Sequence, residues 1–190
     1  MGKEFELKYT ATPEILAAVR QELDGIMEIS METTYYDTFD KDLSARHMTL
    51  RRRFENGLSV CTLKAPDGAN RRKEWEVEAD SIEAAIPVLC KLSNWKELEE
   101  LTAKGLIAVC GARFTRQAAT VTLPNCVVEI ALDSGILLGG GREVPLCELE
   151  VELKSGSEAA ATQFANMLAV SHGLIRESKS KFARAMTLAE

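Results

Sequence analysis

Charged side chains alternate with apolar ones in several short segments of the chain. Residues 3–10 alternate in this way, 145–154 carry a glutamate at every other position, and 47–55 carry two arginines spaced alike. Because alternate side chains of a β-strand point to opposite faces, each segment places its charges on one face of a sheet. The residues that share such a face are Glu4, Glu6, Lys8, Arg51, Arg53, Lys64, Arg72, Glu74, Glu76, Glu129, Asp133, Glu148, Glu150 and Glu152.

The acidic and basic members of this set favour two kinds of ligand. Clustered carboxylates with few histidines and no thiolate pair favour hard cations such as Mg²⁺ or Mn²⁺. Arginine gives forked hydrogen bonds to phosphate oxygens, and lysine gives a point charge. The combination predicts a metal-phosphate site for a substrate with several phosphates in a row. The expected chemistry is hydrolysis or transfer at a phosphoryl group.

The number of acidic residues favours a closed sheet over an open one. Facing acidic pairs on an open sheet would repel each other, at roughly 0.2–1 kcal/mol per pair. Interleaved basic side chains and divalent cations remove that cost. A sheet with one face in water explains a single strand but not the whole set. We therefore expect apolar residues to point outward under helices, and charged residues to surround a wet lumen.

Eight segments with a period of two are expected to form the strands that position these side chains. Asn56-Gly57 predicts a two-residue hairpin turn, and Leu123-Pro124-Asn125 predicts a second hairpin. The three glycines at 139–141 predict a loop before the last strand. The predicted strands are 3–10, 33–38, 47–55, 58–65, 72–79, 112–122, 125–132 and 145–154.

Helical patterns interrupt the strands at four places. Thr12 and Pro13 form an N-cap and first turn, and glycines follow the ends of three of the helices. Pro87 predicts a break or a kink in the second helix. The predicted helices cover 12–25, 80–92, 95–104 and 157–172.

Composition limits the class of protein. The 190 residues are 46% hydrophobic, and no linker or repeat divides them, so we expect a single domain over 1–190. The net charge of −6 argues against a long nucleic acid as partner. No apolar run is long enough for a membrane span, and the N-terminus lacks a signal peptide, which predicts a cytoplasmic protein without a membrane partner. Five scattered cysteines support neither a disulfide framework nor a zinc site.

A series of motifs resembles the CYTH domains, also called triphosphate tunnel metalloenzymes. Residues 4–8 match the ExExK signature of that family. The other motifs follow in the family's order and span nearly the whole chain. They are Thr34-Tyr35-Tyr36-Asp37-Thr38, Leu50-Arg51-Arg52-Arg53, Thr62-Leu63-Lys64, Arg72 with Glu74 and Glu76, residues 128–135, residues 148–153 and Ser180-Lys181-Phe182-Ala183-Arg184.

The resemblance implies a mainly β (α+β) fold, an eight-stranded antiparallel closed β-tunnel with a charged lumen and helices packed outside. Within the family, the chain is most similar to bacterial inorganic triphosphatases, which implies metal-dependent hydrolysis of tripolyphosphate to pyrophosphate and phosphate, with Mg²⁺ or Mn²⁺ as cofactor. Glu4, Glu6 and Lys8 would be catalytic. The implied metal ligands are Glu4, Glu6, Glu148, Glu150 and Glu152; the phosphate contacts are Lys8, Arg51, Arg53, Lys64, Arg72, Arg116, Lys181 and Arg184; and the supporting residues are Glu74, Glu76, Glu129 and Asp133.

Other functions within the fold stay open at this point. Thiamine triphosphate or a nucleotide could be hydrolysed, or ATP could be cyclised, but an organic substrate needs a stacking surface and only 6% of the residues are aromatic. A non-catalytic polyphosphate-binding module would not need the glutamates, and they are present. An RNA-end triphosphatase would need an exposed basic track, which the sequence does not contain. The sequence does not decide whether Arg113 or Arg116 faces the lumen. It does not indicate the oligomeric state either.

Overall fold

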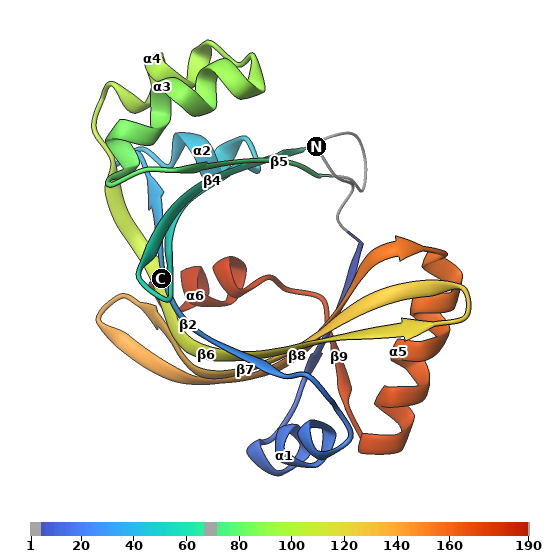
Figure 1. Ribbon diagram of the computed structural model, residues 1–190. Coiled ribbons are helices and arrows are strands. Elements are labelled where there is room, and N and C mark those ends of the chain that lie inside the picture. Colours follow the sequence, from blue (N-terminus) through green and yellow to red (C-terminus); the bar gives the residue numbers. More distant parts are fainter. Residues whose placement is uncertain (1–4, 67–71, 190) are drawn as a thin grey trace.

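The computed structural model describes residues 5–66 and 72–189, and its main element is one strongly curved antiparallel sheet (Figure 1). The strands lie in the order β5-β4-β3-β2-β6-β7-β8-β1-β9. Their bounds are Glu6–Thr10 (β1), Met27–Asp37 (β2), Thr49–Glu55 (β3), Leu58–Pro66 (β4), Arg72–Glu78 (β5), Ile107–Leu123 (β6), Cys126–Gly139 (β7), Arg142–Gly156 (β8) and Ile175–Glu177 (β9).

All eight predicted strands are present, and four of them differ clearly in length from the prediction. β2, β6, β7 and β8 are each longer than predicted because their additional residues do not alternate charge with apolarity. Cys110, Leu137 and Val144 in these extensions pack with a helix on the concave side, so apolar residues take the face where charged ones were expected. The short strand β9, which pairs with β1, was not predicted.

The sheet is not closed into a tunnel by hydrogen bonds among the described residues. β5 and β9 are its two edges, and β1 lies beside β9. The fold class is as expected, a mainly antiparallel β structure with helices outside. Two details differ from the prediction: the described sheet has nine strands in place of eight, and hydrogen bonds do not join its two edges, because alternation along a strand fixes which face a residue takes but not whether the edges meet.

The tight turns follow the local sequence. Asn56 (φ 50°) and Gly57 (φ 89°) join β3 to β4, the left-handed pair that such a hairpin requires. Pro124 and Asn125 join β6 to β7, as predicted. The expected loop at 139–141 is a two-residue turn at Gly140 and Gly141, since Gly139 still belongs to β7.

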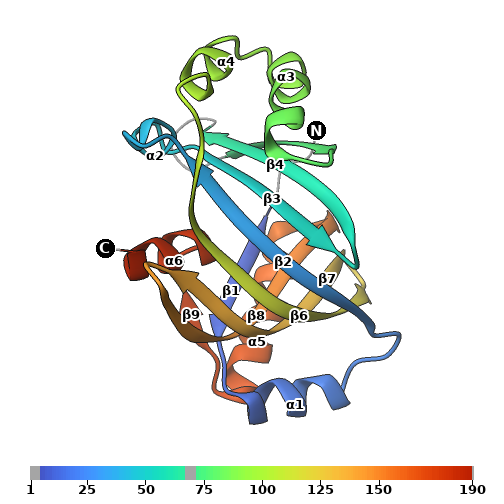
Figure 2. The same ribbon diagram turned by 90° about the vertical axis from the view of Figure 1, so that its left-hand side faces the viewer.

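Among the described residues, five helices cover the convex face (Figure 2). Pro87 lies inside α3 (Ile82–Ser93) and neither ends nor breaks that helix. Ile86 before the proline and Leu89 after it are both buried against the sheet. In the described part of the chain no helix is long and apolar enough to span a membrane. The five are α1 (Pro13–Gln21), α2 (Asp42–Ala45), α3 (Ile82–Ser93), α4 (Glu97–Thr102) and α5 (Glu158–His172).

A sixth helix, α6 (Lys181–Ala189), lies inside the curve of the sheet and was not predicted (Figure 1). It packs on the concave side of β6 and β7 through Phe182, Ala185 and Met186. Gly139 lets it come close, because a Cβ there would lie 2.2 Å from the carbonyl oxygen of Ala185. The start of α6 therefore brings two basic side chains toward the sheet's charged face.

Candidate active site

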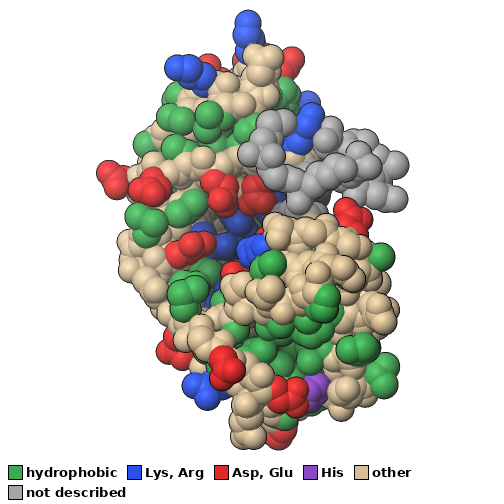
Figure 3. All heavy atoms as spheres, turned by 45° about the vertical axis from the view of Figure 1, so that its right-hand side comes forward, with side chains coloured by type: hydrophobic (Ala, Val, Ile, Leu, Met, Phe, Trp, Pro, Cys, Tyr) green, Lys and Arg blue, Asp and Glu red, His purple; other side chains and the backbone are tan. Residues whose placement is uncertain are grey.

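The concave face encloses a cavity of about 1010 Å³ whose lining is mainly charged. Figure 3 shows this hollow, with Lys and Arg side chains inside it and Asp and Glu side chains beside them. Its size matches that of typical small-molecule sites. The charged lining residues are Glu6, Lys8, Arg51, Arg53, Glu55, Lys64, Glu74, Glu76, Arg116, Glu150, Glu152, Lys179 and Lys181.

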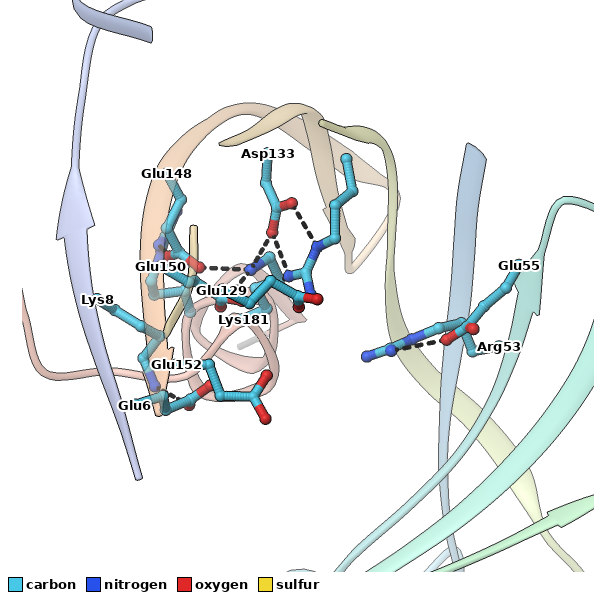
Figure 4. A network of polar contacts seen from close by, with 12 residues as sticks. Glu6, Lys8, Arg53, Glu55, Glu129, Asp133, Glu148, Glu150, Glu152 and Lys181 are labelled. Atoms are coloured by element: carbon cyan, nitrogen blue, oxygen red, sulfur yellow. Dashed lines mark hydrogen bonds and ion pairs between the residues drawn. The ribbon is translucent and has the colours of Figure 1, made fainter. Parts of the chain in front are cut away.

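A dense ion-pair cluster forms the wall made by β6, β7, β8 and the start of α6 (Figure 4). Arg116 binds Asp133 with two hydrogen bonds of 2.8 and 2.7 Å, and its guanidinium also contacts Glu150. The Lys181 ammonium lies 2.7 Å from Asp133 and 2.8 Å from Glu150, and it contacts Glu148 as well. Because the two cations bridge all three carboxylates, the cluster is held rigidly in one arrangement.

Burial and pairing shift the pKa values of this cluster in opposite directions. Burial raises the pKa of Glu148 to about 7, with a further contribution from Glu150, although Lys181 opposes the shift. Burial would also raise the pKa of Glu150, but Lys181 and Arg116 together hold it well below its usual range. The charges of these partners likewise overcome burial and raise the pKa of both Arg116 and Lys181. Glu150 is thus the carboxylate whose charge is most strongly fixed.

The adjoining wall, on β1 and β8, carries carboxylates that are more open to the cavity. Glu6 lies opposite Glu152 in the strand register, and Lys8 lies opposite Glu150. The Lys8 ammonium is 2.9 Å from Glu6, and the Glu6 and Glu152 side chains are 31% and 29% exposed. Lys154 contacts Glu152 at 2.9 Å from the outer side. This wall offers oxygen ligands at the surface of the cavity.

The wall across the cavity, on β3, β4 and β5, carries three cations, Arg51, Arg53 and Lys64, and is called the basic wall below. Arg53 extends from β3 toward the acidic cluster, and its guanidinium is 3.0 Å from Glu55 (Figure 4). The ammonium of Lys64 is 2.9 Å from Glu74. Arg51 lies 3.4 Å from the same glutamate and 3.7 Å from Glu76, so each of the three cations on this wall is paired with a glutamate of the same wall.

Most of the predicted site residues line the cavity. Four described ones do not, namely Glu129, Asp133, Glu148 and Arg184. Asp133 and Glu148 have no exposed surface, so they lie beneath the lining instead of on it. The Arg184 guanidinium contacts Glu148, and Glu129 is 3.3 Å from Lys154. Glu4 and the side chain of Arg72 lie outside the described residues. Of the two candidates on β6, Arg116 lines the cavity, whereas Arg113 pairs with Glu143 on the surface.

Several lining residues were not among the predicted site residues, and Thr33, Glu55 and Lys179 are three of those that carry a hydroxyl or a charge. Thr33 and Glu55 share a face with Tyr35 and Arg53, so the alternation along β2 and β3 could have identified them. Lys179 lies in the segment between β9 and α6, where no periodic pattern gives its direction.

The described lining residues fit a hard divalent cation. They provide carboxylate oxygens and neither histidine nor cysteine. Asp133, Glu148 and Glu150 have oxygens within 4.8 Å of one another, but Arg116 and Lys181 already contact them. Glu6, Glu150 and Glu152 are the described carboxylates that line the cavity on β1 and β8, whereas Glu55, Glu74 and Glu76 line it on the opposite wall beside the cations.

The sequence and the fold of this chain both match known proteins. The CYTH domain profile matches residues 2–186. The inorganic triphosphatase of Haemophilus influenzae is 30% identical over 99% of this chain, which spans about half (55%) of that protein's length. Two solved structures match over nearly their whole length. One is a Hippeastrum protein described as an adenylyl cyclase candidate with a dominant triphosphatase activity (TM-score 0.69, 17% identity, covering 98% of this chain and 96% of that one). The other is from Pyrococcus horikoshii (TM-score 0.65, 23% identity, 97% and 98%), and at these identities both show the fold alone.

Proposed function

Because the chain belongs to the CYTH domain family, we propose that it is a divalent-metal-dependent hydrolase that converts inorganic tripolyphosphate to pyrophosphate and phosphate. One observation supports this most. A single cavity carries a basic wall with Arg51, Arg53 and Lys64 and, across from it, a wall with carboxylates open to the interior. A metal-bound chain of phosphates requires both kinds of wall in one space.

The basic wall would bind and orient the substrate. Arg53 carries its charge in a buried position, where burial and then the nearby Arg51 lower its pKa. A polyanion between these two arginines reduces their mutual repulsion, and forked hydrogen bonds fix its phosphate oxygens. Lys64 would extend the same row of cations along β4.

The carboxylate wall would hold the metal and position the attacking water. Glu6, Glu150 and Glu152 are the described ligands, and a divalent cation held there would neutralise phosphate charge and make bound water more acidic. Lys8, 2.9 Å from Glu6, orients that carboxylate and adds positive charge beside the phosphates. No histidine is among the described lining residues to activate a serine, so direct attack by water is the mechanism that these groups support.

The aromatic side chains of the cavity favour an inorganic substrate. Tyr35 and Phe182 pack against each other with ring centroids 5.0 Å apart. Phe114 is 6% exposed, and two cations lie over its ring. These rings are covered by protein groups, so they offer little open surface for a base or a thiazole ring. That the H. influenzae relative is an inorganic triphosphatase supports the same choice.

A comparison of substrates tests the proposal. Phosphate release would be measured with Mg²⁺ and with Mn²⁺ from tripolyphosphate, thiamine triphosphate and ATP at equal concentrations. We expect tripolyphosphate to give the highest kcat/KM, and EDTA to abolish turnover of all three. If either organic triphosphate is hydrolysed at least as fast as tripolyphosphate, the substrate assignment is wrong.

A further inference from the structure

Three buried polar atoms on one wall of the cavity have no hydrogen-bond partner within the described chain. They are the hydroxyl oxygen Oγ1 of Thr33 and the Nε atoms of Arg51 and Arg53. Buried polar groups in proteins are nearly always paired, so isolated exceptions need an explanation. Here the exceptions are not scattered. All three belong to the neighbouring strands β2 and β3, and all three residues line the cavity.

The strand register places Thr33 beside one of the two arginines. Thr33 on β2 lies directly opposite Arg53 on β3, and Arg51 is opposite Tyr35, two residues further along. The hydroxyl cannot swing far away, because Thr33 is only 3% exposed and its backbone is tightly packed against β6. Gly111 on β6 makes that packing possible, since a Cβ there would lie 2.6 Å from the Thr33 carbonyl oxygen.

The rest of the wall does not supply the missing acceptor. Arg53 uses Nη1 to reach Glu55, and Arg51 uses Nη2 to reach Glu74, so the donors nearest the strands remain unused. Three N–H or O–H donors without a protein acceptor, one neutral and two on cations, therefore lie at neighbouring positions of one wall of the cavity. An oxyanion with several acceptor oxygens matches such a set, whereas a metal ion or a cationic group does not.

We propose that Thr33 is a substrate-binding residue whose hydroxyl donates a hydrogen bond to a phosphate oxygen held by Arg51 and Arg53. This inference rests on the proposed function, because it takes the ligand to be the triphosphate of that reaction. Thr33 adds a neutral donor on a short side chain close to the strand, beside two cations on long side chains. It therefore helps to determine where along the phosphate chain the substrate is held, which charge alone cannot do.

Binding without turnover gives the direct test. Isothermal titration calorimetry in EDTA would measure the Kd of inorganic tripolyphosphate for the wild-type chain, Thr33→Val and Thr33→Ser. Valine has the shape of threonine without the hydroxyl, and serine keeps the hydroxyl. Thr34→Val is the matched control, because Thr34 is on the opposite face of the same strand. We expect Thr33→Val to raise the Kd about tenfold or more, Thr33→Ser to stay within about threefold, and Thr34→Val to leave the Kd unchanged.

Thermal unfolding of the same variants separates binding from folding. Thr33→Val should unfold at or above the wild-type temperature, because it removes a buried polar atom that has no protein partner. A Kd for Thr33→Val within twofold of wild type overturns the inference and indicates that water satisfies the hydroxyl. An equal loss in Thr34→Val also overturns it, and so does a wild-type chain that binds no tripolyphosphate.

The outcome is distinguishable from failure of the proposed function. If the wild-type chain binds tripolyphosphate in EDTA but does not hydrolyse it with either metal, the hydrolase proposal fails. The role of Thr33 as a phosphate contact is then still decided by the Kd of Thr33→Val relative to the Kd of the wild-type chain.

Discussion

Glu6 and Glu150 point into the same cavity, but their partners give them different roles. Glu150 is fixed by Arg116 and Lys181, which lower its pKa, and it belongs to a nearly buried network. Within the described part of the chain, Glu6 forms an ion pair with Lys8 alone and remains 31% exposed. A carboxylate with few competing cations can give more of its charge to an incoming ion. We therefore regard Glu6 as the described residue most dependent on the metal for its role.

Changing Glu6 to Gln tests that role. The substitution keeps size and removes charge, so metal affinity or kcat should fall by about 10–100-fold or more while the fold is retained. The measurement is phosphate release from tripolyphosphate over a range of Mg²⁺ and Mn²⁺ concentrations. Glu143→Gln is the control, because Glu143 pairs with Arg113 on the surface. Near-normal turnover at low metal concentration in Glu6→Gln would remove Glu6 from the set of ligands.

Changing Arg53 to Ala tests the basic wall. Loss of a buried, phosphate-facing guanidinium should raise KM or lower kcat for tripolyphosphate at least tenfold, which corresponds to about 1.4 kcal/mol. The control is Arg52→Ala, since Arg52 is the next residue on β3 and bonds to Ser59 on the convex side. If steady-state kinetics of the two variants match, Arg53 does not contact the substrate.

For single residues, the sequence predicted which face of the sheet a side chain takes better than it predicted which residues form ion pairs. Alternation correctly placed Arg51, Arg53 and Lys64 on one side, because a strand has only two sides to choose from. It did not predict that Glu148 would be covered by Lys181, or that Asp133 would be held by Arg116. Those contacts join residues far apart in the chain, and no local pattern carries that information.

The elements explain why Lys181 was the harder residue to place. Helix α6 was not predicted, because its apolar residues meet the concave side of the sheet, which was expected to be wet. The Asn56-Gly57 hairpin was predicted without error, because its turn type depends on two adjacent residues alone. Local signals thus determined the turns and most strands, whereas tertiary packing determined α6, β9 and the extensions of β6 to β8.

Substituting Gly139 tests whether the seating of α6 matters. A methyl group there would overlap the Ala185 carbonyl, so Gly139→Ala should destabilise the fold by about 1–3 kcal/mol and displace Lys181 from the cavity. Thermal unfolding and turnover of tripolyphosphate would both be measured. Gly141→Ala is the comparison, because no atom lies within 4 Å of its added Cβ, and its strained turn should leave turnover close to wild type. Wild-type stability and turnover in Gly139→Ala would contradict this account of α6.

The whole molecule carries a net charge of −6, yet its cavity is suited to a polyanion. The two facts are compatible because net charge describes the long-range field, whereas a short ligand responds to the groups that surround it. Among the described residues, acids and bases of the lining are close to balanced, and each divalent ion would add positive charge. The argument from net charge therefore applies to a long nucleic acid on the surface and not to a short phosphate chain inside.

Tripolyphosphate should stabilise the folded chain even without metal. At a concentration about a hundred times Kd, the ligand adds about 2.7 kcal/mol to the free energy of unfolding. For a chain of this size that corresponds to a rise in Tm of roughly 5–10 °C. Differential scanning fluorimetry in EDTA would measure it, with orthophosphate at the same ionic strength as the control. Equal rises in Tm with both anions would indicate a general effect of salt and not a specific binding site for tripolyphosphate.

The hydrolysis itself is followed most directly by ³¹P NMR of tripolyphosphate incubated with the wild-type chain and Mg²⁺. The account predicts that tripolyphosphate disappears as pyrophosphate and orthophosphate appear in equal amounts, and that added EDTA stops the reaction. Tripolyphosphate that is bound by the chain but stays unchanged would contradict it, and would make the cavity a binding site without catalysis.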